Sequence, residues 1–262
     1  MVMAVFGFFA SARSLSDCNV ALLGDSMTWI GGDSCDVERG WSCHFKRMAS
    51  PKSISVFARS GATWTNTTST KIDAEAFSDV LDDHNVVYNQ VVRLCRAAAS
   101  GEAPVPDVIV VYAGANDAWF ASRRNGIFDE TAEAVVSAPP FDMSVPPSDV
   151  VSLAGSVRLS CDMLSRNFPT ARIVLVTPTE MVQAPLERVR RVSDIIEGVA
   201  KGLHAEVIRA DKEVEIRRDV EGAGRHRYTS DGIHTNPAGA RLLGGFLAER
   251  LGAIVAAIPP VR

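Results

Sequence analysis

Three side chains that together can make a hydroxyl group nucleophilic lie near the two ends of this chain. Ser26 stands in the tetrapeptide 24–27 (Gly-Asp-Ser-Met), directly after the apolar run 20–23, where a first strand would lead into a helix. Asp231 and His234 are three residues apart in the segment 231–234 (Asp-Gly-Ile-His). A carboxylate and an imidazole are the groups that a serine needs to become reactive near neutral pH. The pattern predicts a serine hydrolase.

Each of these elements also has a purely structural interpretation. A serine after a strand is commonly a helix N-cap. The segment 114–117 (Gly-Ala-Asn-Asp) offers Asn116, but an asparagine in such a setting is often an Asx-turn residue. Gly61 by itself indicates only that the backbone there has a positive φ angle or passes close to another group. The chemistry therefore depends on whether the fold brings the four elements together.

The elements that would position these residues alternate along the chain. Short segments rich in Val and Ile predict five buried parallel strands, at about 19–23, 54–57, 107–113, 172–177 and 205–210. Between and after them, the clearest helices are expected at 86–99, 150–166, 186–202 and 237–256. Strands that alternate with helices imply right-handed crossovers. We expect an α/β fold: a three-layer α/β/α sandwich with a mostly parallel, about five-stranded, flavodoxin-like sheet.

In such sheets, ligands bind beyond the carboxyl ends of the strands. The segment 24–26 follows the first predicted strand, 59–61 follows the second, and 114–117 follows the third. Asp231 and His234 lie in the loop before the last helix. The four elements are therefore expected to meet at one edge of the sheet.

Taken as a set, the four blocks resemble the SGNH superfamily of GDSL-type esterases and lipases, and they span most of the chain. The resemblance implies that Ser26 is the nucleophile, His234 the general base and Asp231 its orienting carboxylate. It also implies an oxyanion hole formed by the amides of Ser26 and Gly61 and the side-chain amide of Asn116. Two positions depart from the pattern: Met27 stands in place of leucine, and Arg59 stands where many members carry an asparagine.

Two further acids, Asp25 and Asp117, sit inside the blocks beside the proposed catalytic residues. Short acidic side chains in loops commonly accept hydrogen bonds from nearby backbone amides. We expect both residues to brace their loops and to take no part in catalysis.

Length and composition fit one domain over 16–262 in a chain of 262 residues with 22% charged residues. The net charge of −4 and the lack of basic runs argue against nucleic acid as a partner. The expected partner is a small-molecule ester, no metal or organic cofactor is implied, and the oligomeric state is open.

A long connection at about 118–149 is expected to be a substrate lid or an ordered excursion packed on the body.

The N-terminal segment 1–15 is signal-like, because an apolar stretch is followed by Ala-Ser-Ala, although it lacks a basic start. This favours export to the periplasm or the cell exterior, with a cytoplasmic location as the alternative. No other segment is long and apolar enough for a membrane span, so the chain is not expected to be an integral membrane protein. In an exported protein Cys35 and Cys43 could form a disulfide; two free thiols are the alternative.

The resulting functional prediction is a carboxylic ester hydrolase that works through an acyl-enzyme on Ser26. A short acyl group, such as an acetyl group on a sugar, is the expected substrate. One alternative is an acyltransferase on the same scaffold. The other is a non-catalytic, flavodoxin-like module that binds a phosphate or another ligand at a helix N-terminus.

Overall fold

A five-stranded, all-parallel sheet forms the centre of the molecule in a computed structural model that describes residues 13–222 and 224–257. The strands are β1 (Asn19–Gly24), β2 (Ser53–Val56), β3 (Val108–Tyr112), β4 (Arg172–Val176) and β5 (Glu206–Ile208). Their order across the sheet is β2-β1-β3-β4-β5, which is the flavodoxin-like order. The predicted fold class is confirmed. Most of the signal-like segment lies outside the described residues.

Burial on both faces explains why the central strands are nearly continuous apolar runs. Every residue of β3 is buried, and β3 pairs with β1 on one side and β4 on the other. The register sets Leu22 of β1 opposite Val110, and Val110 opposite Val174 of β4. Branched side chains pack well on such a pleated surface, so these strands form the middle of the core.

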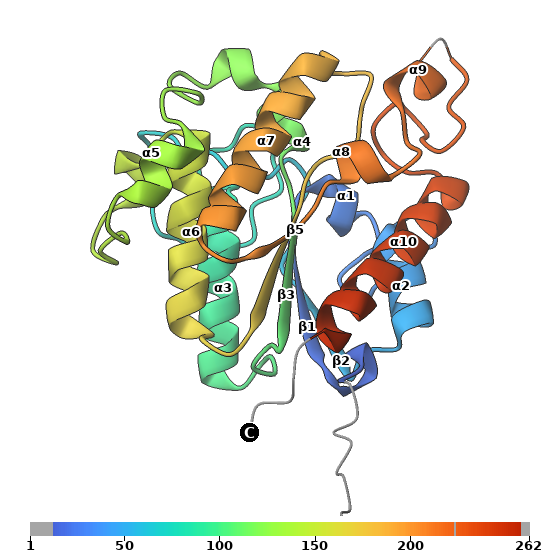
Figure 1. The fold of residues 1–262 in the computed structure, drawn as a ribbon, viewed down its shortest axis with the longest axis horizontal. Coiled ribbons are helices and arrows are strands. Elements are labelled where there is room, and N and C mark those ends of the chain that lie inside the picture. Colours follow the sequence, from blue (N-terminus) through green and yellow to red (C-terminus); the bar gives the residue numbers. More distant parts are fainter. Residues whose placement is uncertain (1–12, 223, 258–262) are drawn as a thin grey trace, which may run out of the picture.

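Helices cover both faces of the sheet, as Figure 1 shows. One face carries α3 (Val87–Ser100), α6 (Leu153–Asn167) and α7 (Leu186–Gly202), and the other carries α2 (Trp41–Ala49) and α10 (Pro237–Ala256), which pack against each other. Shorter helices are α1 (Ser26–Trp29), α4 (Ala115–Trp119), α5 (Ala132–Ser137), α8 (Ala210–Glu213) and α9 (Arg218–Glu221). Single 3₁₀ turns occupy Leu15–Asp17, Ala121–Arg123 and Pro147–Asp149.

Local sequence signals explain where two of the longer helices, α6 and α10, begin. Ser152 caps α6 by accepting a hydrogen bond from the amide of Gly155. Asn236 caps α10 in the same way, and Pro237 occupies its first turn, where no amide donor is needed. For all four long helices, the predicted first and last residues agree with the structure to within three residues.

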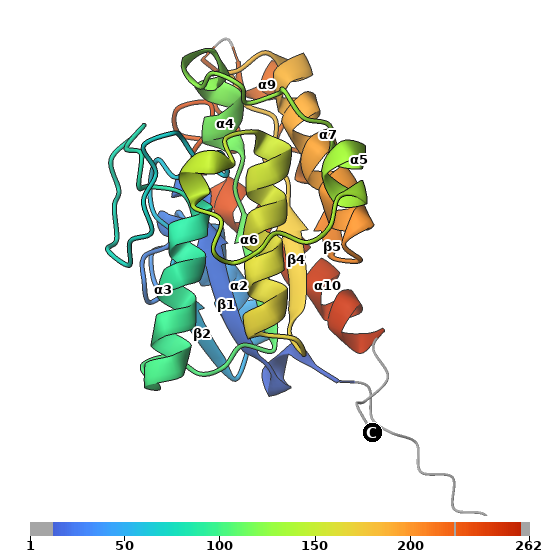
Figure 2. The ribbon, with the colours of Figure 1, turned by 90° about the vertical axis from the view of Figure 1, so that its left-hand side faces the viewer.

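The long connection at 118–149 contains several short helices. Thr131 caps α5, and α5 packs against α6 and α7 on the outside of the sandwich (Figure 2). This part of the connection is therefore an excursion packed on the body, and lid function elsewhere in it stays a prediction.

The structure also bears on the disulfide considered for Cys35 and Cys43 and on the expectation that the chain has no membrane span. Cys35 and Cys43 are both buried and both carry free thiols, so the disulfide considered for them is absent from the structure. Within the described ranges, no helix combines the length and the apolar character that crossing a bilayer requires.

Candidate active site

The turn between β1 and α1 brings Ser26 to the end of the sheet. Gly24 closes β1 with φ near +142°, and a Cβ at that position would lie 2.0 Å from the carbonyl oxygen of Tyr112. Only glycine fits where the two backbones approach so closely. Asp25 then caps α1 by accepting a hydrogen bond from the amide of Met27 at 2.9 Å. Ser26 is the first residue of α1.

A chain of two hydrogen bonds joins Ser26 to the loop before α10. The Nε2 atom of His234 lies 2.9 Å from the Oγ atom of Ser26, and its Nδ1 atom lies 2.7 Å from Oδ2 of Asp231. Ser26 is 208 positions from His234 in the sequence, and the fold brings it together with His234 and Asp231 as the motifs indicated. The arrangement can move a proton from the hydroxyl to the imidazole.

Asp231 holds its own loop as well as the imidazole ring. Its Oδ1 atom accepts hydrogen bonds from the amides of Ile233 and His234, at 3.1 and 2.8 Å. Partial burial by itself raises the pKa of Asp231, but the hydrogen bonds from the His234 side chain and from the two amides outweigh it and lower the pKa below its usual range. The carboxyl group is therefore ionised at neutral pH.

A buried glutamate stabilises this loop through hydrogen bonds. Glu221 is fully buried and accepts hydrogen bonds from the amides of Tyr228 and Thr229, both at 2.9 Å, and from the Thr229 hydroxyl at 2.6 Å. The Thr229 hydroxyl oxygen in turn accepts a bond from the Gly232 amide at 3.1 Å. The segment between α9 and α10 thus stabilises its own conformation.

Three donors that the sequence assigned to an oxyanion hole lie in the turns after β1, β2 and β3. The Asn116 side chain donates one hydrogen bond to the carbonyl oxygen of Ala62 at 2.9 Å, which leaves its second N–H available. In the described part of the chain, the amides of Ser26 and Gly61 donate no hydrogen bond. Gly61 has φ near +78°, and a Cβ there would lie 2.9 Å from the Cα atom of Val80.

Asp25 and Asp117 brace these turns by accepting backbone amides, as expected. The Asp25 carboxylate accepts a second bond from the Ala115 amide at 3.3 Å and so joins the turn after β1 to α4. Asp117 accepts bonds from the amides of Trp64 and Thr65, both at 2.9 Å, and from the Thr65 hydroxyl at 2.5 Å. The turns after β1, β2 and β3 are therefore cross-linked by buried carboxylates.

Burial has an electrostatic cost at Asp25. Its side chain has no exposed surface, and this burial raises its pKa to about 7, although the amides of Met27 and Ala115 favour the ionised form. The nearby negative charge of Asp117 raises the pKa further. Asp25 thus titrates near neutral pH in the turn that carries Ser26.

Gln90 is a supporting residue that the sequence reasoning missed. Its side-chain amide lies along the backbone of Gly24, accepting from the Gly24 amide at 2.7 Å and donating to the Gly24 carbonyl at 2.8 Å. A signal was present, because a glutamine interrupts the apolar face of the helix predicted at 86–99. A buried polar residue on such a face must find a partner, and here the partner is the last residue of the strand that leads to Ser26.

Two partly exposed tryptophans lie one helical turn beyond site residues. Trp29 follows Ser26 by three positions in α1, and Trp119 follows Asn116 by three positions in α4. Residues three apart share a helix face, and helical side chains lean toward the N-terminus. Trp29 is 39% exposed and Trp119 36%. The ring of Trp119 stacks on Phe120 with centroids 4.9 Å apart.

The fold explains why these residues meet at one place. The strand order reverses direction between β1 and β3, and ligands of open α/β sheets bind in the crevice at such a switch point. Ser26 follows β1 and Asn116 follows β3, and Figure 1 shows α1 and α4 at the same end of the sheet. Within the described ranges, no group of three or more His, Cys, Asp or Glu side chains is arranged to hold a metal ion.

The comparison with protein families agrees with this site. The model of the GDSL-like lipase/acylhydrolase family matches residues 22–242, which include every block discussed above. The chain belongs to this family and is a carboxylic ester hydrolase. A search of curated proteins found no match.

Solved structures share the fold at low sequence identity. An acetyl xylan esterase superposes with a TM-score of 0.55 and 18% identity, covering 90% of this chain and 99% of its own. A protein from Bacteroides uniformis assigned to the GDSL-like lipases has a TM-score of 0.57 and 17% identity, with coverage of 90% and 96%. A protein from Lactobacillus plantarum has a TM-score of 0.55 and 17% identity, with coverage of 92% and 98%. At these identities the neighbours establish the fold alone.

Proposed function

We propose that Ser26 is the nucleophile of this ester hydrolase and that His234 is its general base. Asp231 orients the imidazole ring and stabilises the positive charge that forms on it. The observation that carries the proposal is the continuous hydrogen-bonded chain from Ser26 Oγ through His234 to Asp231, at 2.9 and 2.7 Å. His234 takes the hydroxyl proton as Ser26 attacks the ester carbonyl, and returns it to the leaving alcohol. Water then attacks the acyl-enzyme by the same route.

The negative charge that develops on the carbonyl oxygen is stabilised in this proposal by three donors. The amides of Ser26 and Gly61 and the second N–H of Asn116 support that role, because no hydrogen bond within the described chain occupies them. Donors fixed in place before the reaction stabilise the transition state without the cost of reorganising solvent. The bonds from Asn116 to Ala62 and from Asp117 to the 64–65 backbone hold the set in position.

We propose a short-acyl ester, such as an acetyl group on a carbohydrate, as the substrate. One similar fold is that of an acetyl xylan esterase. In addition, Trp29 and Trp119 place partly exposed aromatic rings one turn from Ser26 and Asn116. An indole ring combines a large apolar face with a polar edge, which suits a ligand with the mixed character of a sugar ring.

The nucleophile is tested by changing Ser26 to Ala. Removing the hydroxyl is expected to lower kcat toward p-nitrophenyl acetate by about 10⁶-fold, because no other group can form the acyl-enzyme. Labelling by a fluorophosphonate probe should disappear in the same variant. Ser165→Ala, at an exposed position of α6, is the matched control and should retain full activity and labelling. Wild-type turnover by folded Ser26→Ala would remove Ser26 from the mechanism.

The substrate class is tested with esters of different acyl and alcohol parts. The kcat/KM value should fall as the acyl chain of p-nitrophenyl esters is extended from two to twelve carbons. Acetylated xylan should release free acetate, which separates hydrolysis from transfer to another hydroxyl. Rates that rise with chain length would reject the short-acyl proposal and leave the assignment of Ser26 intact.

A further inference from the structure

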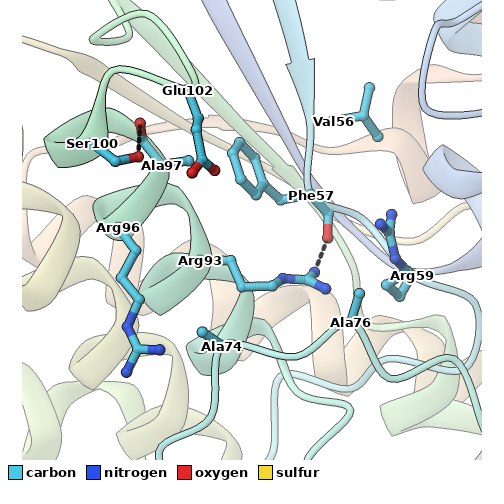
Figure 3. A pocket seen from close by; sticks show the side chains of 10 residues that line it. All are labelled: Val56, Phe57, Arg59, Ala74, Ala76, Arg93, Arg96, Ala97, Ser100 and Glu102. Carbon is cyan, nitrogen blue, oxygen red and sulfur yellow. Dashed lines mark hydrogen bonds between the residues drawn. The ribbon is translucent and has the colours of Figure 1, made fainter.

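A cavity of about 460 Å³ lies away from Ser26, beside the edge strand β2. It lies between the end of β2, the helix α3 and the loop around residues 74–76, as Figure 3 shows. Its charged lining consists of Arg59, Arg93, Arg96 and Glu102. No residue of the proposed catalytic chain lines it. Three cations and one anion make it a positively charged pocket in a protein whose net charge is negative.

Arg93 is largely enclosed by the protein, and its partners are carbonyl oxygens, not carboxylates. It comes from α3 and reaches across the cavity to donate a hydrogen bond to the carbonyl oxygen of Phe57 (Figure 3). A second bond, to the carbonyl of Glu75, is long at 3.5 Å. Its Nε atom is buried without a partner, and no described carboxylate lies within 4 Å of its guanidinium. Buried guanidinium groups are normally paired with an anion.

Arg59 adds a second positive charge from the other side of the Phe57 carbonyl (Figure 3). It contacts the carboxylate of Asp33 at 2.8 Å, but this bond and its bond to the Ala58 carbonyl both use Nη1. The remaining nitrogens of the guanidinium have no partner among the described residues. Burial, together with the charge of Arg59, lowers the pKa of Arg93 to about 10. Two like charges are thus held near one another at a partly buried site.

We propose that this cavity binds a phosphate-sized oxyanion between Arg59 and Arg93. A guanidinium group presents several N–H donors in a planar fork, which matches the oxygens of such an anion. A phosphate group carries close to two negative charges at neutral pH, so it compensates Arg93, which has no carboxylate partner, and adds to the negative charge that Asp33 already provides to Arg59. Glu102, which also lines the cavity, opposes binding by its negative charge. Arg96 is exposed, and its guanidinium points away from the other two arginines (Figure 3).

The position of Arg59 connects this pocket to the oxyanion side of the active site. Its amide donates a hydrogen bond to the Gly24 carbonyl at 3.1 Å, and its carbonyl accepts one from the Ala62 amide at 3.3 Å. The turn that contains Gly61 therefore begins at a residue of the proposed anion site. Arg59 is also the residue that departs from the pattern of the family's second block.

The proposal is tested by titrating the full chain with inorganic phosphate at pH 7.5, followed by calorimetry and thermal unfolding, with sodium chloride keeping the ionic strength constant. Saturable binding with a Kd of about 1 mM or tighter is expected. Arg93→Gln and Arg59→Gln should each weaken binding by about tenfold or more. Arg96→Gln is the matched control and should change Kd by less than about twofold, because exposed charges interact weakly.

A variant that strengthens binding guards against effects of misfolding. Glu102→Gln removes the opposing charge and should lower the Kd, which an unfolded variant would not do. A titration with glucose 6-phosphate separates the sources of the anion: equal affinity indicates free phosphate, and tighter binding indicates a phosphoryl group on a larger molecule. No saturable binding up to about 10 mM phosphate, or equal affinity in the wild type and in folded Arg93→Gln, would overturn the proposal.

Discussion

The two halves of the active site are built in different ways. The nucleophile and oxyanion half is buried, and hydrogen bonds between separate turns hold it: Asp25 reaches α4, Asp117 reaches the 64–65 backbone, and Asn116 reaches Ala62. The base half is a surface loop in which the side chain of Asp231 is 50% exposed and that of His234 27%. Many of its hydrogen bonds lie within residues 221–236.

This difference separates catalysis from stability. A change in the exposed loop removes a chemical group but disturbs few neighbours, so it should affect activity far more than folding. A change at a buried carboxylate that joins two turns leaves several amides without partners, which costs stability directly. Variants can therefore be ordered by how strongly each one tests the contrast.

Among the variants that test this contrast, the largest effect is expected from Asp231→Asn. The amide group would donate toward His234 Nδ1 and stabilise the wrong tautomer, so kcat should fall by about 10⁴-fold. The free energy of unfolding should change by less than about 1 kcal/mol, because the position is half exposed. Steady-state kinetics and urea unfolding measure the two quantities. A large loss of stability would contradict the view that the base loop is a local structure.

Asn116→Ala should affect both catalysis and stability. Loss of an oxyanion donor is expected to lower kcat by about 10²–10³-fold with little change in KM. The Ala62 carbonyl loses its donor, so the free energy of unfolding should also fall, by about 1 kcal/mol. Unchanged kcat in the folded variant would exclude Asn116 from the oxyanion hole.

Asp117→Ala should affect stability before chemistry. The change leaves three buried donors, from Trp64 and Thr65, without an acceptor, and we expect a loss of about 3 kcal/mol in the free energy of unfolding. Asp142→Ala is a suitable control, because that carboxylate is exposed and bonds only within its own turn. Similar stability losses in the two variants would show that the cross-links between turns contribute little.

The smallest effect concerns pH and Asp25. Its pKa is about 7 in the folded protein and 3.8 in an ordinary solvent-exposed aspartate, so between these values the folded state holds a proton that the unfolded state releases. The stabilisation from this group is complete below pH 3.8 and is lost as the pH rises through 7. From pH 5 to pH 8, the wild type should lose roughly 2 kcal/mol more unfolding free energy than Asp25→Asn. Parallel pH profiles would contradict this.

Most of the sheet was predictable because its strands are buried on both faces. Runs such as 108–112 are apolar throughout, and this composition identifies a central parallel strand without any alternation. Strand ends were wrong by up to two residues, most clearly at β5, where only Glu206–Ile208 pair. Helix α2 gave no clear signal, since it is short and lacks a side-chain cap. The role of its aromatic residues appears only in the folded protein, where the ring of Trp41 packs between those of Phe45 and Tyr112.

The site was predictable where its residues lie in compact motifs and unpredictable where they act across the fold. Ser26, Asp231 and His234 could be selected from local patterns, and the structure places them within hydrogen-bonding distance. The partners of Gln90 and Glu221 are set by tertiary packing, which no local pattern encodes. The same holds for the approach of Arg59 to Arg93, whose side chains come from a turn and a distant helix.

The order of the site residues along the chain has a consequence for biosynthesis. Ser26 is synthesised 208 positions before His234, which lies just before α10, the helix that packs on α2. A growing chain that has not yet extended through His234 has no imidazole to pair with Ser26. The proposed mechanism therefore requires that synthesis pass His234, and that the loop before α10 fold, before Ser26 can attack an ester.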